Sequence, residues 1–274
     1  TQELVDAYWT TDGKTKPTLS TMDQRIKDYK ALADEIKGNE NTNKKTFNEA
    51  VNSIENSLPN KAYLSQFKNR DSRLYASIIF PYSAVNKYRP NEYQHYVPEV
   101  NNYGESGYAF RKMSGADDVI PISGGAYYGT GVDFPVIRLA EMLLIYAEAH
   151  TQNIGYDGTV VAELNKLRTR AGMPEVPTGL SKNDALDFIR KERRIELAGE
   201  GLRFFDIRLY EDDTRNGGFK GTEAASVVMK GQIKDVVGKL GAEKIWAPRL
   251  MYMPLPTTAL DKNKNAGMKQ NPGY

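Results

Sequence analysis

The chain has 274 residues, 40% of them hydrophobic, which is enough to bury the core of one large domain or two small ones. Its 37 basic and 35 acidic residues nearly cancel, so no sustained field favours nucleic acid or an anionic membrane surface. Cysteine is absent, which excludes disulfides, thiol catalysis and cysteine-based metal sites. His95 and His150 lie far apart and outside any metal-ligand spacing, and we predict no metal and no cofactor.

Residues 1–80 are expected to hold connecting helices and a strand. The chain opens with a strand or short helix that turns at Asp12-Gly13. Apolar residues then recur at helical spacing in two groups, Ile26 to Ile36 and Phe47 to Ile54, which predicts one or two amphipathic helices. Farther along, Leu74, Ala76, Ile78 and Phe80 alternate with other residues up to Pro81, and this alternation predicts a strand.

Residues 81–134 read as a variable loop region, because they are rich in Tyr, Gly, Pro and Asn and show no sustained period. Residues 211–274 are expected to form a loop followed by a C-terminal extended segment. The longest apolar run, residues 142–147, is far too short to cross a bilayer.

Residues 135–210 carry the strongest helical patterns. The first helix is expected to start at Asp133 with Pro135 in its first turn, and it is apolar on nearly all faces, which predicts a buried helix. The next carries an apolar stripe that begins at Val160 and ends near Gly172, and a third is capped by Ser181 with Asp184. Two helical hairpins of similar length predict a mainly α fold of tetratricopeptide-like pairs with long irregular loops and little β-structure, although the usual repeat signature is absent.

A charged motif, ERRIELAGEGLRFFDIR, occupies residues 192–208 and poses a choice between catalysis and scaffolding. Glu192 and Glu196 share the apolar face of the third helix, where an unpaired charge would be very costly. An acid/base pair would need one carboxyl kept protonated, whereas nearby guanidinium groups lower carboxyl pKa values. We therefore interpret this set as structural ion pairs. Its expected members are Arg138, Glu141, Arg168, Arg170, Glu192, Arg193 and Glu196.

Several stretches, taken in order, resemble the C-terminal motifs of the SusD/RagB family. They are DFPVIRLAEMLLIYAEA, LNKLRTRAGMP, IRKERRIELAGEGLRFFDIRLY and MYMPLPTTALDKNKNAGMKQNPGY, with weaker matches at ELVDAYWTTDGK, NRDSRLYASIIFP and GYAFRKM. The resemblance covers nearly the whole chain and identifies it as the C-terminal portion, residues 1–274, of a SusD/RagB-like domain. Complete members are longer, with an N-terminal helical half and a lipid-attachment cysteine, so we expect this chain to be processed or a fragment.

The resemblance implies a non-catalytic binding protein on the surface of the outer membrane of Bacteroidetes. Members of the family bind glycans or other nutrients and cover a SusC-like TonB-dependent transporter, to which they deliver the ligand. The implied ligand is starch-like or another oligosaccharide, and the implied membrane attachment is a lipid anchor upstream of this chain. Two alternatives remain open, namely a helical-repeat scaffold that binds only protein and a glycan-active enzyme that uses the paired carboxylates.

The best candidate for the ligand site is the aromatic stretch between residues 82 and 103. Sugars stack their C–H faces on aromatic rings and need convergent polar groups, and this stretch combines both. The alternative for each tyrosine is that its buried ring fastens the loop to the scaffold. The candidates are Tyr82, Tyr88, Arg89, Tyr93, His95, Tyr96, Asn101 and Tyr103.

Overall fold

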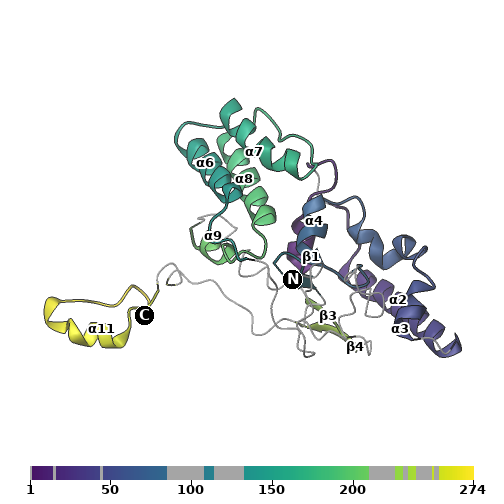
Figure 1. Ribbon diagram of the computed structural model, residues 1–274. Helices are drawn as coiled ribbons and strands as arrows, with labels where there is room; N and C mark the ends of the chain where they lie inside the picture. The colour runs from purple at the N-terminus through teal and green to yellow at the C-terminus, as the bar shows by residue number, and fades with distance from the viewer. Residues whose placement is uncertain are drawn as a thin grey trace.

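The computed structural model describes residues 2–14, 17–43, 46–84, 108–113, 133–209, 226–230, 234–238, 249 and 253–274. Helices dominate these residues, and the strands form only two small antiparallel sheets (Figure 1). The expected mainly α fold is therefore confirmed. No helix among these residues is long and apolar enough to span a membrane.

The N-terminal part consists of short helices around one long helix. Thr46 caps α3 through a capping box with Glu49. Tyr29 and Ile36 of the predicted apolar group are buried on one face of α2, together with Leu32. The opening segment is a short helix, and Gly13 turns the chain after it with a φ of 68°. The elements are α1 (Gln2–Ala7), α2 (Met22–Asn43), α3 (Phe47–Asn52), the 3-10 helices η1 (Leu58–Asn60) and η2 (Ala62–Phe67), and α4 (Ser72–Ser77).

The strand expected up to Pro81 is mostly wrong, because residues 72–77 form helix α4. Asp71 caps this helix by accepting a hydrogen bond from the Arg73 amide, and Ser77 is buried whereas Ala76 is exposed. This burial follows a helical period, not a period of two. Only β1 (Ile78–Ile79) is a strand, and it pairs with β2 (Ala109–Phe110).

The second part is a cluster of helical hairpins. Asp157 caps α7, Ser181 caps α8, and Gly172 ends α7 with a φ of 64°, so these boundaries follow the sequence signals. Helix α6 packs against both α7 and α8 (Figure 1). The cluster comprises α6 (Leu139–Asn153), α7 (Gly158–Arg170), α8 (Lys182–Glu196) and α9 (Arg203–Leu209).

Helix α6 differs from its prediction in two ways. It begins at Leu139 and not near Asp133, because Arg138 is extended and directs its side chain to Glu196 at the end of α8 and to Glu200 just after it. It is also buried on one face only, through Ala140, Leu144 and Ala147. An apolar composition shows that a helix face can be buried, but not which neighbour covers it.

Between α9 and the C-terminus, the described residues contain a hairpin and a short helical segment. In the sheet, β3 (Ser226–Lys230) pairs antiparallel with β4 (Lys234–Gly238). The C-terminal residues form α11 (Thr257–Lys262) and the 3-10 helix η5 (Lys264–Ala266). The sequence predicted a loop and an extended segment for these residues. The strands of the hairpin and the C-terminal helices are too short to show a clear hydrophobic period in the sequence.

Candidate functional site

Most of the predicted ligand residues lie outside the residues that the structure describes. Tyr88, Arg89, Tyr93, His95, Tyr96, Asn101 and Tyr103 belong to that group, and the prediction for them stays a prediction. Tyr82 is described and is only 5% exposed, with its ring centroid 5.9 Å from that of Tyr29. The Tyr82 ring therefore fastens the start of the aromatic stretch to the core, which is the alternative weighed for each tyrosine.

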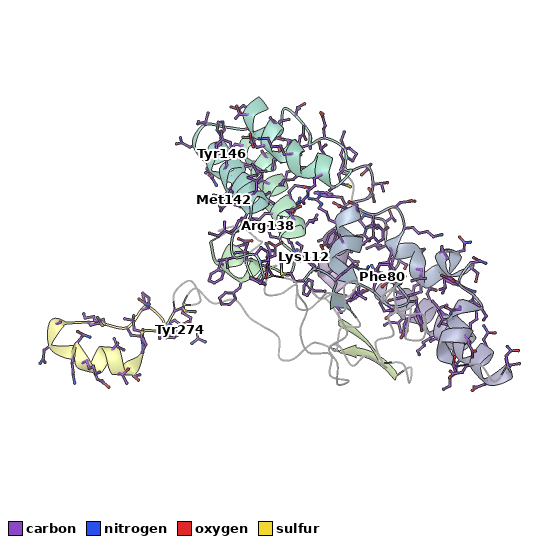
Figure 2. The ribbon with its side chains drawn as sticks, viewed as in Figure 1. Phe80, Lys112, Arg138, Met142, Tyr146 and Tyr274 are labelled. Carbon is purple, nitrogen blue, oxygen red and sulfur yellow. The ribbon has the colours of Figure 1, made fainter. Side chains whose placement is uncertain are left out.

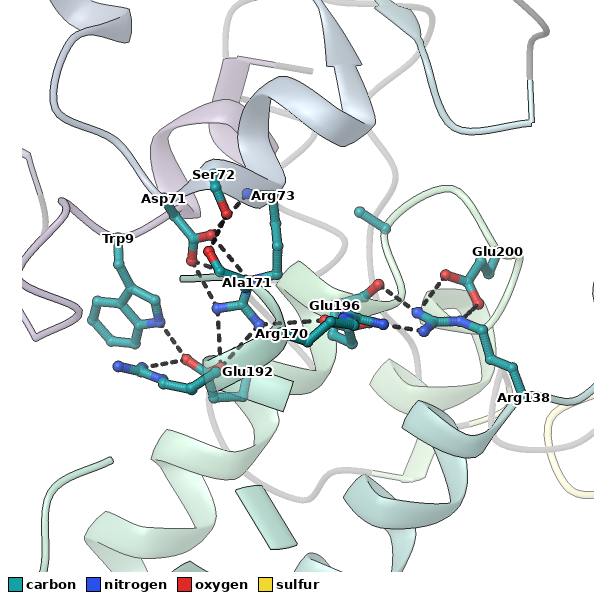
Figure 3. A network of polar contacts seen from close by, with 12 residues as sticks. Trp9, Asp71, Ser72, Arg73, Arg138, Arg170, Ala171, Glu192, Glu196 and Glu200 are labelled. Carbon is teal, nitrogen blue, oxygen red and sulfur yellow. Dashed lines mark hydrogen bonds and ion pairs between the residues drawn. The ribbon is translucent and has the colours of Figure 1, made fainter. Parts of the chain in front are cut away.

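Three carboxylates of the 192–208 motif, Glu192, Glu196 and Glu200, lie in a buried polar network at the junction of α4 and α8 (Figure 3). Glu192 is 1% exposed. Its Oε1 accepts hydrogen bonds from Arg168 Nη2 and Trp9 Nε1, each at 2.6 Å. Its Oε2 accepts from both Nη atoms of Arg73 at 3.1 Å. Both oxygens of this buried carboxylate are thus fully engaged by donors from other elements.

Glu196, one helical turn later, has three guanidinium partners. Its Oε1 lies 2.6 Å from Arg170 Nη2 and 2.8 Å from Arg138 Nη1, and its Oε2 lies 3.4 Å from Arg73 Nη1. Burial alone would raise the pKa of the Glu196 carboxyl, but the hydrogen bonds from Arg170 and Arg138 outweigh it and hold the pKa below its ordinary value. The group is therefore ionised at neutral pH.

Glu200 extends the network beyond the predicted set. Its carboxylate binds the fork of Arg138, with Nε and Nη2 each 2.7 Å from one oxygen, and Lys112 Nζ lies 2.6 Å away. Burial raises the pKa of the Glu200 carboxyl, and the Arg138 and Lys112 hydrogen bonds overcome that effect and lower it. Lys112 also donates to the Glu196 and Ala198 carbonyls, so it fastens the segment after β2 to the end of α8.

All seven predicted ion-pair residues form ion pairs, but not in one cluster. Arg193 faces away from Glu192 and Glu196, with its Nε 2.9 Å from Asp206 and its Nη2 3.8 Å from Glu141. The sequence reasoning missed Arg73, whose side chain bridges Glu192, Glu196 and Asp71. The sequence pattern predicts a strand for this segment, and 119 residues separate Arg73 from Glu192, so no local signal links the two.

This arrangement is poorly suited to acid/base chemistry. Glu192 and Glu196 are 1% and 3% exposed, so neither presents an oxygen to a substrate in the structure. The lowered pKa of the Glu196 carboxyl also disfavours the protonated acid that proton donation requires. Within the described part of the chain, no group of three or more His, Cys, Asp or Glu side chains could hold a metal ion. The network instead joins helices α4, α7 and α8 to the residue before α6 and to the Trp9 segment.

Comparison with known proteins agrees with this architecture. The chain belongs to the SusD family, which it matches over residues 1–274. A SusD-like protein from Bacteroides fragilis resembles it with a TM-score of 0.66 at 24% identity, covering 100% of this chain and 46% of that one. A SusD homologue from Bacteroides thetaiotaomicron gives a TM-score of 0.50 at 22% identity, covering 74% of this chain and 41% of that one. At these identities the likeness concerns the fold.

Relatives known by sequence are also longer than this chain. SusD-like protein P2 of Formosa agariphila is 30% identical over 145 residues, which make up 50% of this chain and 25% of that protein. SusD-like protein P38 of the same organism is 35% identical over 80 residues, or 26% of this chain and 16% of that protein. The chain thus matches about a quarter or less of these proteins and just under half of the Bacteroides fragilis structure.

Proposed function

We propose that this protein is a non-catalytic, surface-exposed glycan-binding protein that delivers an oligosaccharide to a SusC-like TonB-dependent transporter. The observation that carries the proposal is membership of the SusD family along the whole chain. Its expected location is the outer membrane, to which a lipid anchor outside these residues would attach it. The expected ligand is starch-like or another oligosaccharide.

The geometry of the charged motif supports the non-catalytic part of the proposal. The two carboxylates that an enzyme would use are buried and bound by Arg73, Arg138, Arg168 and Arg170. A retaining or inverting glycosidase needs both of its carboxyl groups to reach the scissile bond, and one of them must give up a proton. Carboxylates whose oxygens are buried and hydrogen-bonded between helices are poorly placed to reach a scissile bond or to donate a proton to it.

The ligand site is proposed to lie in the aromatic stretch of residues 82–103, in its part between Tyr88 and Tyr103. The buried Tyr82 ring supports this by fixing the start of that stretch to the rigid core, which is how a scaffold positions a binding loop. Aromatic faces supply sugar stacking, and Arg89, His95 and Asn101 supply polar contacts.

A glycan array with the purified chain tests the proposal most broadly. We expect one class of oligosaccharide to bind, and mass analysis after prolonged incubation should recover it at its original length. Failure of every glycan to bind would refute the proposal and favour a protein-binding scaffold. Shortening of the glycan that disappears in a Glu192→Gln variant would instead show that the motif is catalytic.

A further inference from the structure

The turn that leads into the aromatic stretch has a tyrosine at a position that favours glycine. The Ser83 amide donates a hydrogen bond to the Phe80 carbonyl at 2.9 Å, which closes a four-residue turn with Pro81 in its second position. Tyr82, in the third position, has a φ of 64°. Proline followed by a residue with positive φ is the pattern of a type II turn, in which glycine or asparagine usually takes the third position. A tyrosine there has a strained backbone that its surroundings must stabilise.

The turn is held on the core by two aromatic side chains. The Tyr82 ring is buried, and its centroid lies 5.9 Å from that of Tyr29 in α2. Phe80 stacks on Phe67 of η2 with 4.0 Å between the ring centroids, and it lies among the N-terminal helices (Figure 2). Burial of these rings offsets the strain at Tyr82, so the ring and the backbone of this residue act together.

The same part of the core holds the chain where it returns after the aromatic stretch. Tyr108 is 7% exposed, and its ring meets that of Phe67 edge-on, with 6.4 Å between the centroids. Tyr63 connects the two sides, because its ring centroid lies 5.1 Å from that of Tyr29 and 5.9 Å from that of Phe67. The rings are therefore in contact in the order Tyr82, Tyr29, Tyr63, Phe67 and Tyr108, and we call these five residues the anchor rings.

Backbone contacts join the departing and the returning chain at this place. Strands β1 and β2 pair, and the Arg111 amide donates to the Ser77 carbonyl at 2.8 Å. Arg111 also donates from Nη2 to the Ala84 carbonyl at 2.6 Å. The chain thus leaves the core at Ala84 and returns at Tyr108 with both ends fixed. A segment with fixed ends has fewer conformations to lose when it binds a ligand.

We propose that the anchor rings are positioning residues for glycan binding, and that Tyr82 is the member that fixes how the chain enters the aromatic stretch. The inference rests on the proposed function, because it takes the ligand contacts to lie in that stretch. The anchor rings are at most 7% exposed, so they act without touching the ligand. They raise affinity by increasing the share of molecules in which the stretch has its binding geometry.

Substitutions at Tyr82 separate the effect of the ring from that of the backbone. Tyr82→Gly and Tyr82→Asn remove the ring and suit the φ of the turn, whereas Tyr82→Phe keeps the ring. Leu144→Ala is the control for lost stability, because Leu144 is fully buried in α6, in the hairpin cluster. Circular dichroism identifies a temperature at which every variant is folded, and both measurements are made there.

The first measurement is the Kd for a glycan that binds on the array. It should rise at least about tenfold in Tyr82→Gly and Tyr82→Asn, which corresponds to about one molecule in ten keeping the binding geometry. The second needs no glycan: trypsin should cleave the bond between Lys87 and Tyr88 at least about tenfold faster in these two variants. Tyr82→Phe and Leu144→Ala should match the wild type in both measurements.

Unchanged cleavage in Tyr82→Gly and Tyr82→Asn would overturn the proposal. Faster cleavage at an unchanged Kd would also overturn it, because Tyr82 would then hold the segment without serving binding. Equal losses of affinity in Tyr82→Gly and Leu144→Ala would show a general effect of stability in place of positioning. If no glycan binds the wild type, the proposed function fails, and the cleavage rates still decide whether Tyr82 anchors the stretch.

Discussion

Glu192 illustrates at the residue scale how hydrogen-bonding partners allow a carboxylate to be buried. Trp9, Arg73 and Arg168 approach it from three different parts of the chain, and each donates at 3.1 Å or less. A buried charge is tolerated only when such partners replace water, and removal of one member leaves the others unpaired. The residue therefore acts as a shared acceptor that fixes the relative positions of its donors.

Replacement of Glu192 by Ala should lower the free energy of unfolding by about 3 to 5 kcal/mol, because it removes a carboxylate that two buried guanidinium groups and an indole N–H share as an acceptor. Urea denaturation of the variant measures this loss. Glu163→Ala is the control, since Glu163 pairs with the exposed Lys166, and it should cost less than about 1 kcal/mol. Equal stability of the two variants would mean that Glu192 is not buried in solution.

Glu196 should make stability depend on acid pH. Its folded-state pKa is lowered, so its contribution is present above the unfolded-state pKa and is lost as the pH falls through the lower folded-state value. The melting temperature should therefore fall below about pH 4.5, where unfolded glutamates begin to bind protons. The Glu196→Gln variant should be less stable at pH 7 and should lose less on acidification. A parallel acid profile in both proteins would contradict this assignment.

At the element scale, the turn after α8 depends on two glycines with similar backbones and different surroundings. Gly199 and Gly201 have φ values of 84° and 81°, in the left-handed region that other residues adopt at a cost. A Cβ added at Gly199 would lie 3.0 Å from the Phe110 ring, whereas at Gly201 nothing lies within 4 Å. The turn thus lets a β2 side chain pack directly on the backbone that carries Glu200 to Arg138.

Substitution of these glycines by Ala should separate backbone strain from the packing of Phe110. Gly201→Ala should cost about 1 to 2 kcal/mol from its φ alone. Gly199→Ala should cost more, because the Phe110 ring must also shift, and the Phe110→Ala background should remove that excess. Thermal unfolding of the three variants and the double variant measures both effects. Equal costs at the two glycines would show that the ring does not pack there.

The helices that the sequence predicted well are those whose ends and apolar faces are both encoded locally. Helix α8 is an example, because Ser181 caps it and Ile189, Glu192 and Glu196 share its buried side. Helix α4 was taken for a strand, because over six residues the two periods differ little and the Asp71 cap decides between them. The start of α6 was misplaced because the long-range pairing of Arg138 with Glu196 and Glu200 holds that residue extended.

At the scale of the whole molecule, the polar network joins the N-terminal helices to the hairpin cluster. Helices α1 and α4 both contact α8, and the network lies at this junction (Figure 3). The sequence indicated which acidic residues would be buried, but it could not bring Trp9 and Arg73 to them, because no local pattern links positions more than a hundred residues apart. Whether the aromatic candidates contact a ligand depends in the same way on the geometry of their loop, which composition does not define.

Because the network crosses this junction, the two parts should unfold together. In a Trp246→Phe background, which leaves Trp9 as the single tryptophan, the tryptophan fluorescence and the far-UV circular dichroism of the helices should show coincident transitions. In Arg73→Ala, which removes the bridge between Asp71, Glu192 and Glu196, the fluorescence transition should come first. Coincidence of the two transitions in that variant would mean that apolar contacts alone couple the parts.

We propose that this protein binds glycan through its aromatic stretch and uses its charged motif only as a scaffold. Calorimetric titration of a glycan identified on the array, with melting temperatures measured in parallel, tests both halves in one set of variants. Tyr88, Tyr93, Tyr96 and Tyr103 are replaced by alanine one at a time. At least one of these variants should bind the glycan more weakly at a nearly unchanged melting temperature. Glu192→Gln should instead lower the melting temperature and leave the Kd of the folded protein unchanged. Intact affinity in all four tyrosine variants, together with lost affinity in a Glu192→Gln protein of normal stability, would contradict the account.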